Sequence, residues 1–253
     1  MNAKTQTILL VLGGIAVLSI GVWRTMTAPP LAHILVGVDR SRSVEPNCAG
    51  LRSAAEALLD RPGVGVGSTF TLLSMGAHAR APEPQLLLSA SIPIPSDRVV
   101  GQSAQAKAYE QERSAFLAGL ASRCESIEET THTPLYQMVE RGLTHLRGLQ
   151  EGCPPGASCV LLIKSDLLED VQPELRAALD AATKDTDTPV PSALAGRLQN
   201  DGIDVIFCGT AEVRAPAKGT IAPPIAVRER IWRALFSRPE AVSFQPFCVG
   251  PTG

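Results

Sequence analysis

A carboxylate and two hydroxyls recur at alternate positions near the start of the chain, in Asp39, Ser41 and Ser43. These oxygen atoms can converge on one small divalent cation of the kind that prefers oxygen ligands. They follow directly on a short apolar run at residues 33 to 38. Asp and Ser are also favoured N-caps, so the same residues can instead cap a helix expected from about residue 45. The pattern alone leaves both interpretations open.

The apolar run predicts a strand that is buried on both faces of a parallel sheet. In open α/β sheets, the loops that leave the carboxyl ends of the strands form the ligand crevice. A second apolar run at residues 159 to 165 is followed by another carboxylate, Asp166, and between the two runs Thr131 and Thr133 precede an amphipathic pattern. Further oxygen ligands are therefore expected at the same edge of the sheet.

These three separated motifs resemble, in type and order, those of the von Willebrand factor A domain family and its metal-ion-dependent adhesion site. The resemblance covers about residues 32 to 248. It implies an α/β, Rossmann-like, doubly wound sheet of six mostly parallel strands, with one antiparallel edge strand and helices on both faces. It also implies Mg²⁺, or another divalent cation such as Mn²⁺ or Ca²⁺. The implied hydroxyl ligands are Ser41, Ser43 and Thr133, with Thr131 as the alternative to Thr133, whereas Asp39 and Asp166 would act mainly through waters.

The expected function follows from the charge of such a site. With only two carboxylates, the ion keeps an exchangeable water and attracts an outside anion. In the resembling family this anion is an Asp or Glu side chain of a partner protein, so we expect binding without turnover.

Two other functions remain open. An Asp at the end of the first strand also serves as nucleophile in aspartate-dependent phosphatases, but these usually carry a second Asp where this chain has Ser41. In the other alternative, the domain is a metal-free scaffold in which the hydroxyls only cap helices.

The segment after Asp166 departs from the family pattern, which often has glycine where this chain has Leu167. Glu169 and Asp170 could add a ligand or reduce the attraction of the metal for an outside carboxylate. We favour the interpretation that they are first-turn acids of the next helix. Lys164 is expected to be a strand residue whose charged end reaches solvent.

The six cysteines are even in number, which is typical of a protein from an oxidising compartment. Their spacing contains no Cys-x-x-Cys pair and no Cys/His set of zinc type, and it permits 15 connectivities. The resemblance implies three pairs, Cys48 with Cys124, Cys153 with Cys159, and Cys208 with Cys248. Six buried free thiols are the alternative.

An uncharged stretch near the start of the chain predicts a membrane segment. Residues 7 to 23 would span about 25 Å as a helix, the short end of what a bilayer requires. Residues 26 to 30 form a poor cleavage site, so we expect an uncleaved signal anchor and linker over residues 1 to 30 and the domain over residues 31 to 253. The positive charges after the stretch favour a cytoplasmic domain, whereas the cysteines favour a periplasmic or extracellular one. The second location is the expectation.

Alternating strand and helix patterns predict a doubly wound parallel sheet. The strands are expected at about 33–38, 69–75, 86–94, 159–165, 203–208 and 241–247. The helices are expected at about 45–60, 103–122, 135–149, 172–183, 191–200 and 225–237. Trp232 and Phe236 should pack the last helix on the sheet. The net charge of −2, without a basic cluster, gives no indication of a nucleic-acid partner.

Overall fold

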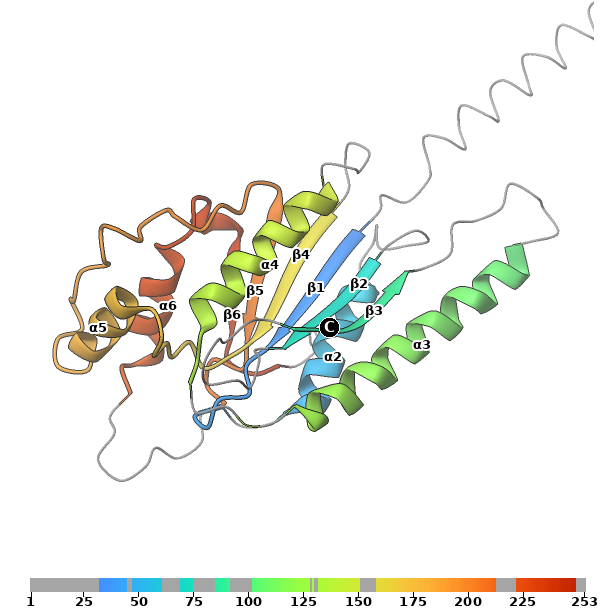
Figure 1. Ribbon diagram of the computed structural model, residues 1–253, viewed down its shortest axis with the longest axis horizontal. Helices are drawn as coiled ribbons and strands as arrows, with labels where there is room; N and C mark the ends of the chain where they lie inside the picture. The colour runs from blue at the N-terminus through green and yellow to red at the C-terminus, as the bar shows by residue number, and fades with distance from the viewer. Residues whose placement is uncertain are drawn as a thin grey trace, which may run out of the picture.

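A central sheet with parallel strands organises the computed structural model (Figure 1). The structure describes residues 32–44, 47–60, 69–74, 85–91, 102–127, 129, 132–150, 158–212 and 222–248. Its six strands are β1 (Ala32–Val38), β2 (Thr69–Ser74), β3 (Gln85–Ser91), β4 (Ser158–Lys164), β5 (Ile203–Cys208) and β6 (Val242–Gln245). They lie in the order β3-β2-β1-β4-β5-β6, and neighbouring strands are parallel except for β2 and β3, which are antiparallel. The predicted α/β class with parallel strands is confirmed.

Helices cover both faces of this sheet and bury a separate apolar core on each. The helices are α2 (Cys48–Leu59), α3 (Gln102–Ser126), α4 (Leu135–Gln150), α5 (Pro173–Ala182) and α6 (Ile225–Arg233), followed by the short 3-10 helix η2 (Pro239–Ala241). In β1, Ile34 and Val36 pack with α2 and α3, while Leu35 packs with α4 on the opposite face. Because successive side chains of a strand point to opposite faces, a continuous apolar run is what this double burial requires.

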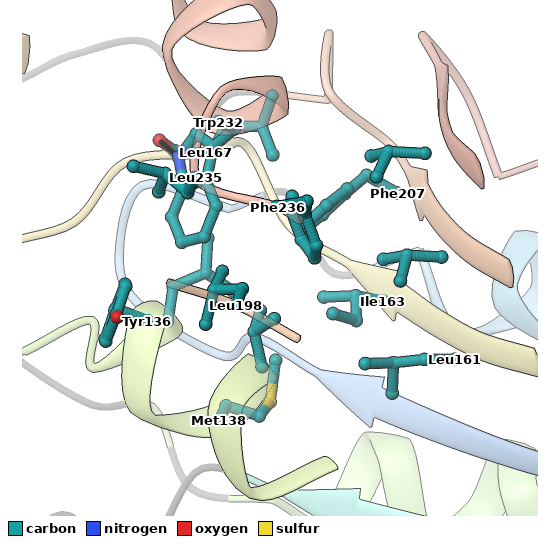
Figure 2. Packing of buried hydrophobic residues seen from close by; sticks show 14 of the residues in the cluster. Tyr136, Met138, Leu161, Ile163, Leu167, Leu198, Phe207, Trp232, Leu235 and Phe236 are labelled. Carbon is teal, nitrogen blue, oxygen red and sulfur yellow. Dashed lines mark hydrogen bonds between the residues drawn. The ribbon is translucent and has the colours of Figure 1, made fainter. Parts of the chain in front are cut away.

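The core on the α4, α5 and α6 face is rich in aromatic side chains (Figure 2). The rings of Phe207 and Trp232 lie 5.6 Å apart between centroids, and those of Phe207 and Phe236 lie 6.2 Å apart. Trp232 and Phe236 are 0% and 2% exposed, as expected from their spacing. Aromatic pairs at these distances add to the stability gained from burial alone.

The helix predicted at residues 191 to 200 is wrong. One turn forms, in which Leu194 and Ala195 donate to the carbonyl of Pro191, and Gly196 then takes a left-handed φ of 67°. A left-handed glycine commonly ends a helix. Leu198 beyond it forms an isolated parallel bridge with Phe236, so the segment is tied to the turn after α6 instead.

Two disulfides confirm two of the predicted pairings. Cys48 is bonded to Cys124, and Cys208 is bonded to Cys248. The alternative of six free thiols is therefore wrong. Cys153 lies outside the described residues, so its pairing with Cys159 stays a prediction. Disulfides of this kind are typical of an oxidising or extracellular environment.

The predicted location as a single-pass membrane protein is contradicted. Each helix within the described ranges is too short or too polar to cross a bilayer. Residues 7 to 23, on which that prediction depended, lie outside these ranges.

Replacing both Cys48 and Cys124 by Ser should lower the free energy of unfolding by about 4 kcal/mol, because the bridge closes a loop of 76 residues in the unfolded chain. The change is measured by urea denaturation. The bridge between Cys208 and Cys248 closes a shorter loop of 40 residues. Replacing both of these cysteines by Ser should therefore lower the free energy of unfolding slightly less. A loss under about 1 kcal/mol for the first pair would contradict this account of its role.

Candidate functional site

The site lies where the strand order changes direction, between β1 and β4. The chain leaves β1 toward β2 and leaves β4 toward β5, so the two following loops run in opposite directions from this switch point, the place where ligands of open α/β sheets generally bind. Asp39 follows β1 directly, and Asp166 lies two residues beyond β4. The backbone N–H of Asp39 donates to the carbonyl of Lys164 at 3.0 Å, which fixes the two loop starts side by side.

The loop after β1 folds around the carboxylate of Asp39. The backbone N–H of Ser41 donates to Oδ1 of Asp39 at 2.8 Å, and the hydroxyl of Ser165 donates to Oδ2 at 2.8 Å. The hydroxyl oxygens of Ser41 and Ser43 are 3.1 Å apart. Three of the predicted site residues are thus joined by direct contacts.

These residues do not cap the first helix. α2 begins at Cys48, and its N-cap is Asn47, whose side chain accepts from the backbone N–H of Gly50 at 2.8 Å. The alternative in which Asp39, Ser41 or Ser43 acts as the cap is therefore wrong. Their oxygen atoms require another explanation.

Asp39 and Asp166 are both 0% exposed and interact with each other. Burial, reinforced by the negative charge of Asp166, raises the pKa of Asp39 from 3.8 to about 7. Burial also raises the pKa of Asp166, although the N–H of Leu168, the hydroxyl of Ser43 and the charge of Arg228 oppose this shift. Desolvation disfavours a charged carboxylate, and a second carboxylate adds to the penalty. Both carboxyl groups therefore keep their protons to a higher pH than an exposed aspartate does.

The two carboxylate oxygens of Asp166 differ in their hydrogen bonding. Oδ1 of Asp166 accepts from the N–H of Leu168 at 3.0 Å, whereas Oδ2 is buried and has no hydrogen-bond partner in the described part of the chain. A buried acceptor without a partner costs free energy unless another group satisfies it.

Thr133 is held at the same edge by acids of the loop after β4. Its backbone N–H donates to Oδ1 of Asp170 at 2.5 Å, and its carbonyl accepts from the N–H of Asp170 at 3.4 Å. Thr133 is only 5% exposed. His132 lies on the rim, with its Nδ1 3.3 Å from Oδ2 of Asp170. Thr131, the alternative ligand, lies outside the described residues.

The sequence suggested that Glu169 and Asp170 are first-turn acids of α5, and this prediction is wrong. Pro173 starts that helix and Gln172 caps it, so both acids precede it. Glu169 instead accepts from the N–H of Tyr136 in the first turn of α4 at 2.6 Å, and from those of Val171 and Gln172. The two acids thus connect the β4 loop to the start of α4.

Three residues that contact the predicted site or its flanking strand were not identified from the sequence. The hydroxyl of Ser165 donates to Asp39, but nothing in the sequence around Ser165 distinguishes it from other serines. Arg228 of α6 is 3% exposed and donates to the carbonyls of Asp166 and Pro223. Glu212 lies beyond β5 and pairs with Lys164. None of these carries a local motif.

Lys164 does not reach solvent, contrary to expectation. It is 1% exposed, and its Nζ lies 3.1 Å from Oε2 of Glu212. Oε1 of Glu212 accepts from Nδ2 of Asn47 at 2.9 Å and from the N–H of Cys248 at 3.0 Å. Glu212 thus connects the end of β4 to Cys248 of the Cys208–Cys248 bridge and to the N-cap of α2.

Leu167 stands where the resembling family often has glycine, and the backbone at this position adopts a conformation that favours glycine. Its φ is 64°, in the left-handed region. Its side chain is fully buried, and its carbonyl accepts from Nε1 of Trp232 at 2.8 Å; both residues are labelled in Figure 2. The N–H of Leu167 donates to the hydroxyl of Ser165. Tertiary contacts therefore maintain a conformation that a leucine disfavours.

The possible metal ligands around Asp39 and Asp166 are all oxygen atoms. The described residues contain no group of three or more His, Cys, Asp or Glu side chains that could hold a metal ion. Two carboxylates and neighbouring hydroxyls, one carboxylate oxygen being unsatisfied, do fit a hard cation such as Mg²⁺ that retains several waters.

Comparisons with known proteins find weak similarities to solved structures. No protein-family model matches the chain, and no curated protein matches it. Proximal thread matrix protein 1 (PTMP1) from the mussel byssus is 12% identical with a TM-score of 0.45, over 87% of this chain and 44% of that one. The manganese-loaded TRAP protein of Plasmodium vivax is 14% identical with a TM-score of 0.37, over 79% and 72%. The chain thus spans less than half of the mussel protein.

Without a divalent cation, stability should fall as the pH rises from 3.8 to about 7, because folded Asp39 keeps a proton that the unfolded chain has released. Each unit of pKa difference corresponds to about 1.4 kcal/mol. Urea denaturation in chelator measures the trend. Asp39→Asn should reduce the slope, whereas the exposed control Asp180→Asn should keep it. Stability that is flat across this window in the unmodified chain would contradict the buried pair.

Leu167→Gly should be more stable than Leu167→Ala by about 1 kcal/mol, because glycine adopts positive φ without the penalty of a Cβ. Both variants lose the buried side chain, so their difference isolates the backbone conformation. Urea denaturation of the two variants gives the difference. The usual order, with alanine more stable than glycine, would argue against a left-handed residue here.

Proposed function

We propose that the chain is a von Willebrand factor A-like binding module that captures a partner protein through a divalent cation, most naturally Mg²⁺. The observation that carries the proposal is the buried pair Asp39 and Asp166 at the strand-order reversal. Their pKa values are raised by burial, and Oδ2 of Asp166 lacks a hydrogen-bond partner among the described residues. A bound cation would favour the ionised form of both groups and satisfy this oxygen.

The hydroxyl and carboxylate residues would have different roles in holding the ion. Ser41, Ser43 and Thr133 would offer neutral hydroxyl oxygens, and Asp39 and Asp166 would supply charge mainly through waters. Asp39 already uses both carboxylate oxygens, one on the N–H of Ser41 and one on the hydroxyl of Ser165. These contacts support a role for Asp39 in which it acts on the ion through water. The direct ligands would then be the hydroxyls of Ser41, Ser43 and Thr133.

The same contacts favour binding over phosphoryl transfer. A nucleophilic carboxylate needs an available oxygen and a nearby acid or base. The two oxygens of Asp39 are engaged, and Ser41 stands where the resembling phosphatases usually carry their second Asp. When bound, the cation would supply an electrophilic position that an Asp or Glu carboxylate of a partner could occupy.

The first test is direct metal binding to the full chain with its disulfides intact. Mn²⁺, a spectroscopic substitute for Mg²⁺, should bind one site by electron paramagnetic resonance. Asp166→Asn and Thr133→Ala should each weaken binding about tenfold or more, because each removes charge or an oxygen ligand. The exposed control Asp180→Asn should bind as the unmodified chain does. Equal binding in all four proteins would place the metal elsewhere.

The second test addresses the acidic partner group. Water relaxation measured on the Mn²⁺ complex should fall when the peptide Gly-Glu-Gly is added, since its carboxylate side chain displaces bound water. Gly-Gln-Gly, with equal termini, is the matched control and should act more weakly. Equal effects of both peptides would contradict recognition of an acidic side chain. Hydrolysis of p-nitrophenyl phosphate that is lost in Asp39→Asn would favour the enzyme instead.

A further inference from the structure

A second candidate site lies along α4, apart from the buried pair Asp39 and Asp166. A cavity of about 430 Å³ opens between α4 and the segment at residues 197 to 199. None of the proposed metal ligands lines it. Its volume falls within the range of about 300 to 1,000 Å³ that is typical of small-molecule sites.

Positive side chains dominate the lining of this cavity. Arg141, Arg147 and Arg197 contribute three guanidinium groups, and Glu140 contributes the one carboxylate. His145 and Thr144 add further polar groups. With histidine neutral, the lining carries two more positive than negative charges. A concave surface of this kind attracts anions.

Two of these arginines make neutral contacts. Nη2 of Arg147 donates to the hydroxyl of Thr144 at 3.2 Å. Nε of Arg197 donates to the carbonyl of Ala193 at 3.2 Å. Other arginines of the chain, such as Arg113 and Arg238, pair with carboxylates. Because these hydrogen bonds go to neutral oxygens, Arg147 and Arg197 retain further guanidinium N–H groups for an outside oxyanion.

The floor of the cavity is apolar and fixed by the fold. Leu143 and Leu198, which are 1% and 2% exposed, belong to the buried core. The N–H of Leu198 donates to the carbonyl of Leu235 at 2.8 Å, so the wall opposite α4 is held by the turn after α6. A site with two fixed walls loses little conformational entropy when a ligand binds.

We propose that this cavity binds a small molecule that carries a phosphate monoester and a compact apolar group. The planar guanidinium groups of Arg147 and Arg197 bind the phosphate oxygens, and the apolar group contacts Leu143 and Leu198. A phosphate monoester carries close to two negative charges at neutral pH, which matches the excess charge of the lining. The site is independent of the proposed metal site.

The test uses the full chain with intact disulfides, in chelator so that no divalent cation contributes. Phenyl phosphate is the probe, and isothermal titration calorimetry should give a dissociation constant below about 1 mM. The double variant Arg147→Gln and Arg197→Gln should weaken binding by about tenfold or more. Arg176→Gln is the matched control, since Arg176 is an exposed arginine of α5 outside the cavity, and it should leave binding unchanged.

Three further measurements decide the outcome. Urea denaturation should show that the double variant is as stable as the control, which confirms that lost binding is not lost folding. Inorganic phosphate should bind more weakly than phenyl phosphate, because it lacks the apolar group. The proposal is overturned if phenyl phosphate does not bind, if the double variant binds it equally, or if a tetraglutamate peptide binds in its place.

Discussion

The burial of Asp39 and Asp166 against one another is the constraint on which the rest of this end of the molecule depends. Two carboxylates with no solvent exposure are tolerated only when donors or cations compensate them. The N–H of Ser41, the hydroxyls of Ser165 and Ser43 and the nearby charge of Arg228 each do part of this. The raised pKa of Asp39 indicates that the compensation is incomplete without a further positive charge.

Polar and covalent connections concentrate at this edge of the sheet. The Cys48–Cys124 bridge joins the start of α2 to the end of α3, and Nε of Arg40, in the loop after β1, donates to the carbonyl of Ile127 just beyond α3. Asp170 holds Thr133, and Glu212 joins Lys164 to the Cys208–Cys248 segment. Loops that carry binding residues need such support, because backbone alone does not fix side chains to the accuracy that a cation requires.

The sequence predicted what depends on local pattern and missed what depends on distant partners. The strand at residues 33 to 38 was recognisable because both of its faces are buried, and Asp39 and Asp166 because each follows such a strand. Lys164 was misjudged because its partner Glu212 is distant in sequence, and Glu169 because its acceptor role involves Tyr136 of another helix. The helix predicted at residues 191 to 200 failed because Gly196 and a bridge to Phe236 outweigh its apolar spacing.

Helix α6 explains how a leucine can stand where the resembling family often has glycine. Arg228 donates to the carbonyl of Asp166, and Trp232, one turn later, donates to that of Leu167. A single helix face therefore fixes two successive carbonyls of the loop, and the buried side chain of Leu167 packs beneath it. A left-handed leucine costs about 1 to 3 kcal/mol, which these contacts offset within the folded chain. The conformation of this loop is consequently maintained by contacts within the fold itself.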